Sequence, residues 1–80
     1  MYYTYILKSK KNNKFYIGYT SNMDDRLNLH NSRYASSTKN SQPWELFYIE
    51  KYDQEAKAIE REKQIKSWKS RKMIEKLKFK

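Results

Sequence analysis

The feature that most constrains the fold of this chain is its single glycine, Gly18, within the tyrosine-rich segment 15–20. A chain that uses glycine once is expected to place it where no side chain would fit. Aromatic and β-branched residues predict one strand over residues 2–8 and a second over 14–20. The polar residues 9–13 between these runs predict a tight turn, so the two strands are expected to form an antiparallel hairpin.

The length of this turn suggests a register for the hairpin. We expect Tyr5 to lie opposite Tyr16 and Tyr3 opposite Gly18, which places all four residues on one face. In that arrangement the missing side chain of Gly18 opens a notch in a floor of tyrosine rings.

Composition indicates a folded domain covering residues 1–80. Charged residues make up 34% of the chain, which is typical of disorder, but aromatic residues make up 16% and supply a large burial per side chain. The absence of cysteine excludes disulfides and zinc–cysteine sites. No apolar run reaches the length of a membrane span and no signal-like segment opens the chain, so the expected location is the cytoplasm.

Positive charge dominates the chain and is concentrated in its last third. Lys and Arg total 18 against nine acidic residues, for a net charge of +9. From Lys57 to Lys80 there are ten Lys or Arg residues against three Glu, a net charge of +7. Such a field favours a polyanionic partner, with nucleic acid first, although a solvated cationic surface would have the same composition.

A first helix is predicted from an N-cap at Ser21-Asn22 to about Tyr34, with two acidic residues in its first turn. Its inward stripe is expected to consist of Met23, Leu27, His30 and Tyr34.

The second half of the chain predicts a loop, a strand and two helices. Residues 35–42 are polar and are expected to form an exposed loop. Residues 44–50 are apolar on both faces and predict a strand that is covered on both sides. A second helix is expected over Gln54–Trp68 with Asp53 as its cap, and a third after Ser70. The apolar side of the third helix would consist of Met73, Ile74 and Leu77.

Glu62 is the most informative single residue. Ala58, Ile59 and Ile65 share its helix face, so a carboxylate stands in an otherwise apolar patch. Burying a carboxylate without a partner is costly. Taken alone, the residue is best explained by a structural ion pair with a nearby Arg or Lys. The functional interpretation is a ligand for a hard cation such as Mg²⁺, which accepts one carboxylate together with waters and phosphate oxygens.

Arg26 and His30 are neighbours on the first helix, four positions apart. An arginine fork suits a phosphate group or the charge that develops during phosphoryl transfer, but the same position suits an ordinary surface arginine. A histidine on an inward stripe is by itself more often a hydrogen-bonded core residue than a catalyst.

The combination of these features resembles the GIY-YIG nuclease domain, in particular its small stand-alone, excinuclease-like bacterial subgroup. Tyr3-Thr4-Tyr5 stands at the first motif and Tyr16-Ile17-Gly18 at the second. Arg26 and His30 match the R-x-x-x-H of the first helix, and Pro43-Trp44 matches the start of the third strand. Residues 58–68, AIEREKQIKSW, are similar to the signature A-x-x-R-E-x-x-I-K-x-W.

The resemblance implies an α+β fold, a small three-stranded antiparallel sheet flanked by about three helices. It also implies divalent-metal-dependent hydrolysis of phosphodiester bonds in DNA, in the context of DNA repair or processing. Glu62 would hold a single Mg²⁺ or Mn²⁺, Tyr16 would help to deprotonate the attacking water, and Arg26 would steady the scissile phosphate. Tyr5 and His30 would complete the hydrogen-bond network. Tyrosine is a weak base near neutral pH, so positive charge from Arg26 and the metal would have to assist Tyr16.

The chain departs from the family pattern in three ways, one of which is that no asparagine follows Asn40, although some relatives carry a late asparagine at the site. Its first motif has Tyr-Thr-Tyr in place of Gly-Ile-Tyr, so only Tyr5 matches strictly. It is also expected to lack an attached DNA-binding module of the kind that usually selects the target in this family. Sequence-specific cutting would therefore require a protein partner.

Two other classes of function remain open. The first is a nucleic-acid-binding module of the same fold without catalysis, which the basic C-terminal third favours. The second is a scaffold with neither activity. The residues expected to track the phosphate backbone are Lys39, Lys66, Lys69, Arg71 and Lys72. For each single lysine, a solvated cationic surface is the simpler explanation.

Overall fold

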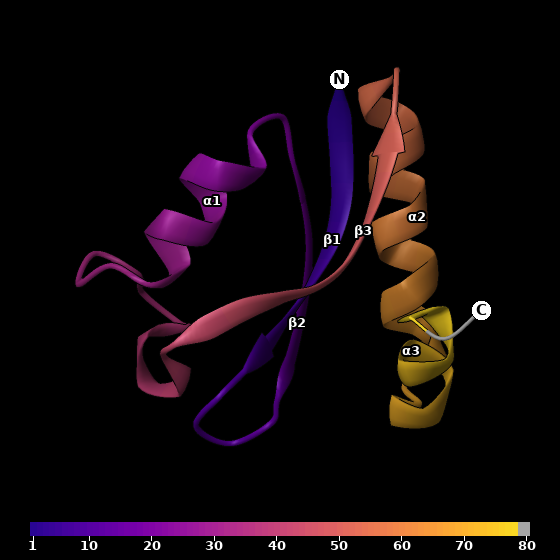
Figure 1. Ribbon diagram of the computed structural model, residues 1–80. Helices are drawn as coiled ribbons and strands as arrows, with labels where there is room; N and C mark the ends of the chain where they lie inside the picture. Colours follow the sequence, from indigo (N-terminus) through magenta and orange to yellow (C-terminus); the bar gives the residue numbers. More distant parts are fainter. Residues whose placement is uncertain (79–80) are drawn as a thin grey trace.

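Three strands form an antiparallel sheet in the order β2-β1-β3. The computed structural model describes residues 1–78 and places β1 (Tyr2–Ser9) between β2 (Phe15–Thr20) and β3 (Trp44–Tyr52). The sheet lies between helix α1 (Met23–His30) on one side and helices α2 (Glu55–Trp68) and α3 (Arg71–Lys78) on the other (Figure 1). The expected α+β fold, with a three-stranded antiparallel sheet and three helices, is confirmed.

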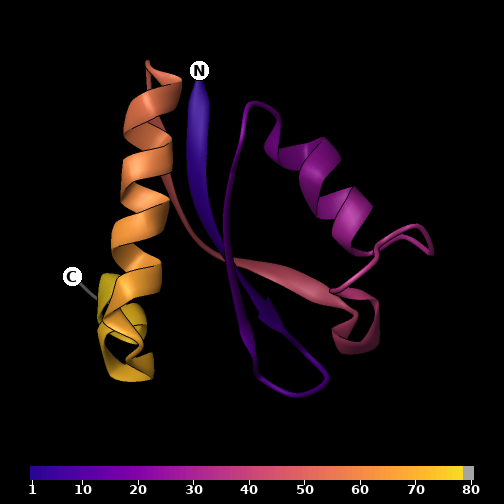
Figure 2. The same ribbon diagram turned by 180° about the vertical axis from the view of Figure 1, so that it is seen from behind.

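The central strand separates two hydrophobic cores because its side chains alternate between the faces of the sheet. Tyr5 and Leu7 are buried on the α1 side together with Trp44. Ile6 points the other way and packs in a core with Ile65, Ile74 and Leu77, on the side that α2 and α3 cover (Figure 2). Coverage of both faces explains why β1 is apolar at successive positions.

The register expected for the β1–β2 hairpin is wrong by two residues. Tyr5 pairs with Gly18 and Leu7 pairs with Tyr16. The Ser9 hydroxyl accepts hydrogen bonds from two backbone N–H groups of the turn, and Asn13 adopts a left-handed conformation with φ of 62°. These features move the centre of the turn toward the C-terminus. A shift of two residues preserves the face, so the tyrosines still share one side.

The notch expected at Gly18 is filled by the ring of Tyr5. A Cβ atom placed on Gly18 would lie 2.6 Å from the Tyr5 hydroxyl oxygen and 2.8 Å from the ring carbon that carries it. Both distances are below normal van der Waals contact. The only glycine of the chain therefore makes room for a tyrosine, and this seats the Tyr5 ring against the backbone of β2.

Helix α1 begins as predicted but ends four residues early. The Asn22 side chain caps it by accepting a hydrogen bond from the backbone N–H of Asp25 at 3.1 Å. After His30 the chain leaves the helix because the Asn31 side chain bonds both the N–H and the C=O of Trp44, at 2.6 and 2.9 Å. Tyr34 is consequently not part of the inward stripe, and 73% of its surface is exposed.

The segment 35–42 was expected to be an exposed loop, and this is wrong for part of it. Ala35 and Thr38 are buried, and residues Lys39–Ser41 form a 3-10 helix. The Thr38 carbonyl accepts a hydrogen bond from the indole N–H of Trp44 at 2.9 Å. Satisfied polar groups therefore tie this polar segment to the α1-side core.

Strand β3 was expected to be covered on both sides, and this is also wrong. It lies at an edge of the sheet, where Leu46 and Ile49 are more than a third exposed. Helix α2 begins one residue later than expected, and its N-cap is Gln54, not Asp53. On α3, Ile74 and Leu77 are buried as predicted, whereas Met73 is 42% exposed. No helix within residues 1–78 has the length and apolar character needed to cross a membrane.

Candidate active site

A buried chain of hydrogen bonds connects β1, α1 and the loop that follows α1. The Tyr5 hydroxyl lies 3.0 Å from His30 Nε2, and His30 Nδ1 lies 3.0 Å from Thr38 Oγ1. Because both ring nitrogens have partners, one donates and the other accepts in either neutral tautomer. The hydrogen bond that the Trp44 indole N–H donates to the Thr38 carbonyl then anchors the outer end of this hydrogen-bond chain.

Burial sets the charge states of this chain. It raises the pKa of the Tyr5 hydroxyl to about 12, the nearby Tyr16 adds to the effect, and the positive charge of Arg26 opposes it. Burial, followed by the charge of Arg26, lowers the pKa of His30. At neutral pH, Tyr5 therefore keeps its proton and His30 is uncharged, so these groups orient neighbours rather than carry charge.

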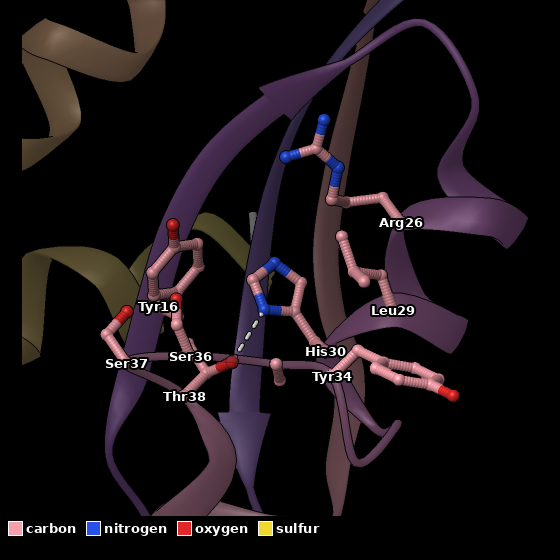
Figure 3. Close-up of a pocket in the computed structure, with 9 residues that line it drawn as sticks. Tyr16, Arg26, Leu29, His30, Tyr34, Ser36, Ser37 and Thr38 are labelled. Atoms are coloured by element: carbon pink, nitrogen blue, oxygen red, sulfur yellow. Dashed lines mark hydrogen bonds between the residues drawn. The ribbon is translucent and has the colours of Figure 1, made fainter.

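A cleft of about 180 Å³ opens beside His30 (Figure 3). Tyr16 stands on one wall, with its ring centroid 4.7 Å from that of His30, and Arg26 stands above the histidine. The residues that line the cleft are Tyr16, Arg26, Leu29, His30, Tyr34, Ala35, Ser36, Ser37 and Thr38. Aromatic, hydroxyl and guanidinium groups thus converge on a space of molecular size.

Arg26 also lines a second cleft, on the side of the sheet where α2 begins. This cleft measures about 280 Å³ and includes Tyr2, Tyr19 and Glu55. Arg26 is half-buried, and among residues 1–78 it has no carboxylate within ion-pair distance. A guanidinium with no ion-pair partner among these residues, and with a carboxylate, Glu55, on the wall of the second cleft only, is suited to an anionic ligand in the cleft beside His30.

Glu62 comes from α2, across the sheet from α1. Its side chain is only 15% exposed, and one carboxylate oxygen lies 3.1 Å from Nζ of Lys66, whose side chain is 54% exposed. The negative charge of Glu62 contributes to the raised pKa of Tyr5. The structure thus gathers Tyr16, Arg26 and His30 around one cleft, with Tyr5 bonded to His30 behind it, while Glu62 is absent from the lining of the cleft.

The chemistry of Glu62 fits a single hard cation. No cluster of three or more His, Cys, Asp or Glu side chains that could enclose a metal occurs among residues 1–78. A cation such as Mg²⁺ does not need such a cage, since it binds through one or two carboxylates and keeps several waters. Glu62 is shielded from bulk water and has one solvent-exposed partner, so its carboxylate can supply a ligand.

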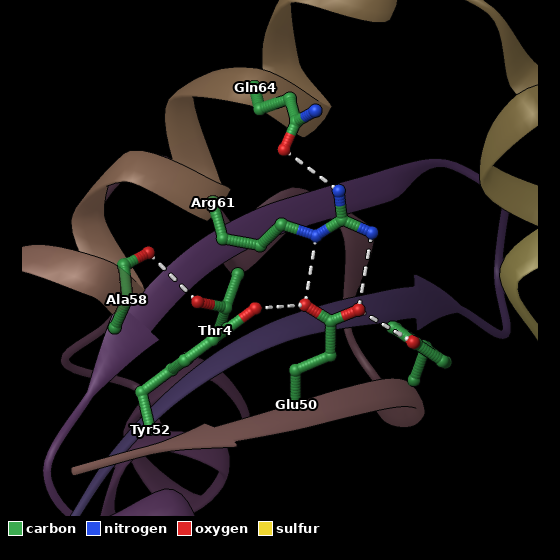
Figure 4. Close-up of polar contacts among 7 residues, drawn as sticks. Thr4, Glu50, Tyr52, Ala58, Arg61 and Gln64 are labelled. Atoms are coloured by element: carbon green, nitrogen blue, oxygen red, sulfur yellow. Dashed lines mark hydrogen bonds and ion pairs between the residues drawn. The ribbon is translucent and has the colours of Figure 1, made fainter.

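A second half-buried carboxylate, Glu50, was not singled out by the sequence. Both of its oxygens bond the guanidinium of Arg61, at 2.9 and 3.2 Å, and each also accepts a tyrosine hydroxyl at 2.7 Å, from Tyr48 and Tyr52 (Figure 4). Burial raises the pKa of Glu50, but the hydrogen bonds from Arg61 and the two tyrosines outweigh it and hold the pKa below its usual value. Glu50 is therefore a structural anion, fixed between β3 and α2.

The basic residues expected to track a phosphate backbone lie in the 3-10 helix, in or at the end of α2, and in α3. Lys39 lies in the 3-10 helix and Lys66 pairs with Glu62. Lys69 ends α2 in a left-handed conformation, with φ of 49°. The Arg71 guanidinium lies 4.4 Å from the ring centroid of Phe15 and pairs with Glu75. Lys72 is exposed on α3.

The sequence missed the residues that complete the cleft. Thr38, Ser36 and Ser37 come from the segment predicted to be a plain loop, yet Thr38 holds His30 and the serines line the wall. The polar composition of this segment is typical of solvent-exposed loops. The available signal was its position, because it connects the helix that carries Arg26 and His30 to the buried Trp44.

Comparison with known proteins agrees with this geometry. The model of the GIY-YIG catalytic domain matches residues 1–77. A UPF0213 protein of Staphylococcus haemolyticus is 38% identical over 68 residues, which cover 84% of this chain and 82% of the relative. A UPF0213 protein of Staphylococcus saprophyticus is 34% identical over 74 residues, which cover 91% and 89%. One of Oceanobacillus iheyensis is 33% identical over 66 residues, which cover 81% and 76%.

No solved structure matches the chain significantly. The GIY-YIG domain defines a nuclease superfamily whose members generally use a divalent metal. The matches cover most of the length of these relatives. From the domain match over nearly the whole chain and from these relatives, it follows that the chain belongs to the GIY-YIG catalytic domain family.

Proposed function

We propose that this protein is a metal-dependent endonuclease core that hydrolyses phosphodiester bonds in DNA. The observation that carries the proposal is the convergence of Tyr16, Arg26 and His30 on one cleft, with Tyr5 fixed behind them. Arg26 provides an uncompensated positive charge where a phosphate would enter. DNA repair or processing is the proposed context, with target choice supplied by a protein partner.

In the proposed reaction, Arg26 holds the scissile phosphate and stabilises the charge that builds up on its oxygens. Tyr16 faces the same cleft, and its hydroxyl oxygen takes a proton from the attacking water while its own proton passes to solvent. The water oxygen bonds to phosphorus as the bond to the leaving ester oxygen breaks, and that oxygen takes a proton from solvent to become a hydroxyl group. The serine hydroxyls on the cleft wall, from Ser36 and Ser37, supply further donors to the phosphate.

Tyr5, His30 and Thr38 act as a rigid support for this chemistry. Tyr5 stays protonated and His30 stays neutral, so neither neutralises the phosphate. Tyr5 also packs beside Tyr16, with ring centroids 6.4 Å apart, and thereby limits the motion of the Tyr16 ring. Rigid positioning of this kind lowers the reorganisation required when the reaction occurs.

Glu62 is the proposed ligand of a single Mg²⁺ or Mn²⁺. When bound, such an ion would act as a Lewis acid on the phosphate and would promote ionisation of the water. Lys66 would give up its contact with Glu62 and turn toward solvent, where most of its side chain already lies.

A specific observation favours a second function, a DNA-binding module without catalysis. Lys66 occupies the Glu62 carboxylate, and Lys57 to Lys80 carries a net charge of +7. In this alternative, Lys39, Lys66, Lys69, Arg71 and Lys72 would contact backbone phosphates, and Glu62 would serve only the ion pair.

Cleavage assays separate the two functions. Plasmid, single-stranded and branched DNA are incubated with Mg²⁺, Mn²⁺ or EDTA. We expect cleavage that requires metal and falls at least about 100-fold in Glu62→Gln, because a metal ligand is lost. Glu60→Gln, an exposed neighbour on α2, is the matched control and should cleave normally.

Cleavage that survives EDTA or Glu62→Gln would contradict the proposed mechanism. Binding that weakens steeply with salt, is unchanged by Glu62→Gln and is accompanied by no cleavage would identify the binding module instead.

A further inference from the structure

The loop after α1 presents an aromatic ring to solvent at the rim of the catalytic cleft. Tyr34 is 73% exposed, more than any other large hydrophobic side chain described, and it lines the same cleft as Arg26 and Tyr16. Its ring points outward from the cleft, away from His30 (Figure 3). The hydrophobic core therefore does not account for its position.

The ring is held in place despite its exposure. The guanidinium of Arg33 lies 5.0 Å from the Tyr34 ring centroid and donates a hydrogen bond of 2.8 Å to the Tyr34 hydroxyl. The backbone is anchored as well, because the Tyr34 N–H donates to Ser32 Oγ at 3.1 Å and Gln42 Nε2 donates to the Ser32 carbonyl at 2.6 Å. An arginine stacked on a tyrosine fixes the ring and adds positive charge beside it.

A fixed, exposed aromatic ring beside an arginine has the properties of a base-stacking site. Every nucleobase has a flat π-face, so stacking on tyrosine tolerates any sequence. The base must be unpaired for its face to be reached. Arg26 and Tyr34 line the same cleft. If a phosphate of a bound strand sits at Arg26, a neighbouring nucleotide of that strand lies beside Tyr34.

We propose that Tyr34, clamped by Arg33, is a subsite that stacks an unpaired nucleobase next to the phosphate held at Arg26. This inference rests on the proposed function, since it takes Arg26 as the phosphate site. It assigns to the loop a role in seating the substrate that is separate from the bond-breaking groups.

Binding measured without cleavage tests the subsite. Fluorescence anisotropy is recorded in EDTA, with the Glu62→Gln variant as the background. One probe is a short oligothymidylate, and the other is a strand with the same number of phosphates in which every nucleotide lacks its base. Both strands offer the same charges, so only the first can stack. We expect Tyr34→Ala to raise the Kd for oligothymidylate roughly 5- to 100-fold and to change the Kd for the abasic strand less than about twofold.

Three further variants sharpen the result. Tyr34→Phe keeps the flat ring and should retain binding to within about twofold, whereas Tyr34→Leu keeps apolar volume and should behave like Tyr34→Ala. Met73→Ala, which truncates another exposed apolar residue, on α3, should leave both affinities unchanged. If Tyr34→Ala weakened the binding of both strands equally, or of neither strand, the proposed subsite would be overturned.

The outcomes also distinguish this inference from the proposed hydrolysis. Metal-dependent cleavage by the wild type together with base-independent binding at Tyr34 would remove the subsite and leave the hydrolysis. Base-dependent binding that requires Tyr34, with no cleavage under any metal, would remove the hydrolysis and support the subsite.

Discussion

Two half-buried glutamates lie on this small molecule, and their surroundings differ in a way that indicates their roles. The side chain of Glu50 is 19% exposed and that of Glu62 is 15% exposed, so the two carboxylates are equally withdrawn from water. Glu50 accepts two hydrogen bonds from Arg61 and two from tyrosine hydroxyls. Glu62 has one contact, with a lysine that is mostly in solvent.

The difference teaches that burial alone does not identify a functional carboxylate. Four donors on two oxygens saturate Glu50 and compensate its desolvation within the protein. A single flexible lysine leaves lone pairs of Glu62 available for another ligand. The ion pair that the sequence suggested for Glu62 is present, with Lys66, but a carboxylate with all of its oxygen lone pairs engaged is found at Glu50.

The largest contrast is expected in metal binding. Glu62→Gln should weaken the affinity for Mn²⁺ at least about 100-fold, because an amide oxygen is a much poorer ligand than a carboxylate for a hard cation. Glu50→Gln should leave the affinity unchanged, since its oxygens are already used. Titration followed by the electron paramagnetic resonance of free Mn²⁺ measures both. Equal loss in the two variants would remove the distinction between the sites.

The contrast should reverse in stability. Glu50→Ala leaves Arg61 and two tyrosine hydroxyls without their partner, and we expect it to lower the free energy of unfolding by about 2–3 kcal/mol, less than for a fully buried pair. Glu62→Ala should lower it by less than about 1 kcal/mol. Urea denaturation at neutral pH measures both values. A destabilisation by Glu62→Ala as large as that of Glu50→Ala would make Glu62 a structural residue.

The sequence predicted the elements of the fold well because most of them are locally encoded. Tyrosine-rich strands and an Asn22 cap depend on neighbours in the chain, and these were confirmed, as was the burial of Ile74 and Leu77 on α3. The hairpin register was wrong because it depends on how Ser9 and Asn13 shape the turn. The coverage of β3 was wrong because an edge position is a property of the whole sheet.

The candidate site was predicted less completely than the fold, for the same reason. Tyr5, Tyr16, Arg26 and His30 belong to regular elements, and the structure places the last three around one cleft with Tyr5 hydrogen-bonded to His30. Thr38 and the Glu50–Arg61 pair depend on contacts between distant segments and have no local signature. Whether Tyr5, Tyr16, Arg26, His30 and Glu62 form a catalytic set stays a prediction.

Acidification should weaken the stabilisation that the Glu50 carboxylate gives to the folded state. The pKa of Glu50 is lowered in the folded state, so its stabilisation is fully present above the unfolded value, near 4.5, and is lost as the pH falls through the folded value. The difference in unfolding free energy between the wild type and Glu50→Gln should therefore be constant from pH 7 to about pH 5 and shrink below. Urea denaturation at a series of pH values measures it. A difference that grows on acidification would contradict the direction of the shift.

The smallest effect is expected for Lys66→Ala, which tests how firmly Lys66 holds the Glu62 carboxylate. An exposed pair four residues apart on a helix contributes only about 0.3–0.5 kcal/mol, because solvent screens it and the lysine loses rotamer freedom when it is held. The free energy of unfolding should change by no more than that. Mn²⁺ affinity should be equal to or above that of the wild type, because a competitor for the carboxylate has been removed. Urea denaturation and the Mn²⁺ titration measure the two quantities on one preparation. If Lys66→Ala instead lowered stability by about 2 kcal/mol and weakened Mn²⁺ binding, Lys66 would hold Glu62 as firmly as Arg61 holds Glu50. The Glu62 carboxylate would then be a second structural anion. That result would favour the nucleic-acid-binding module without catalysis over the metal-dependent nuclease.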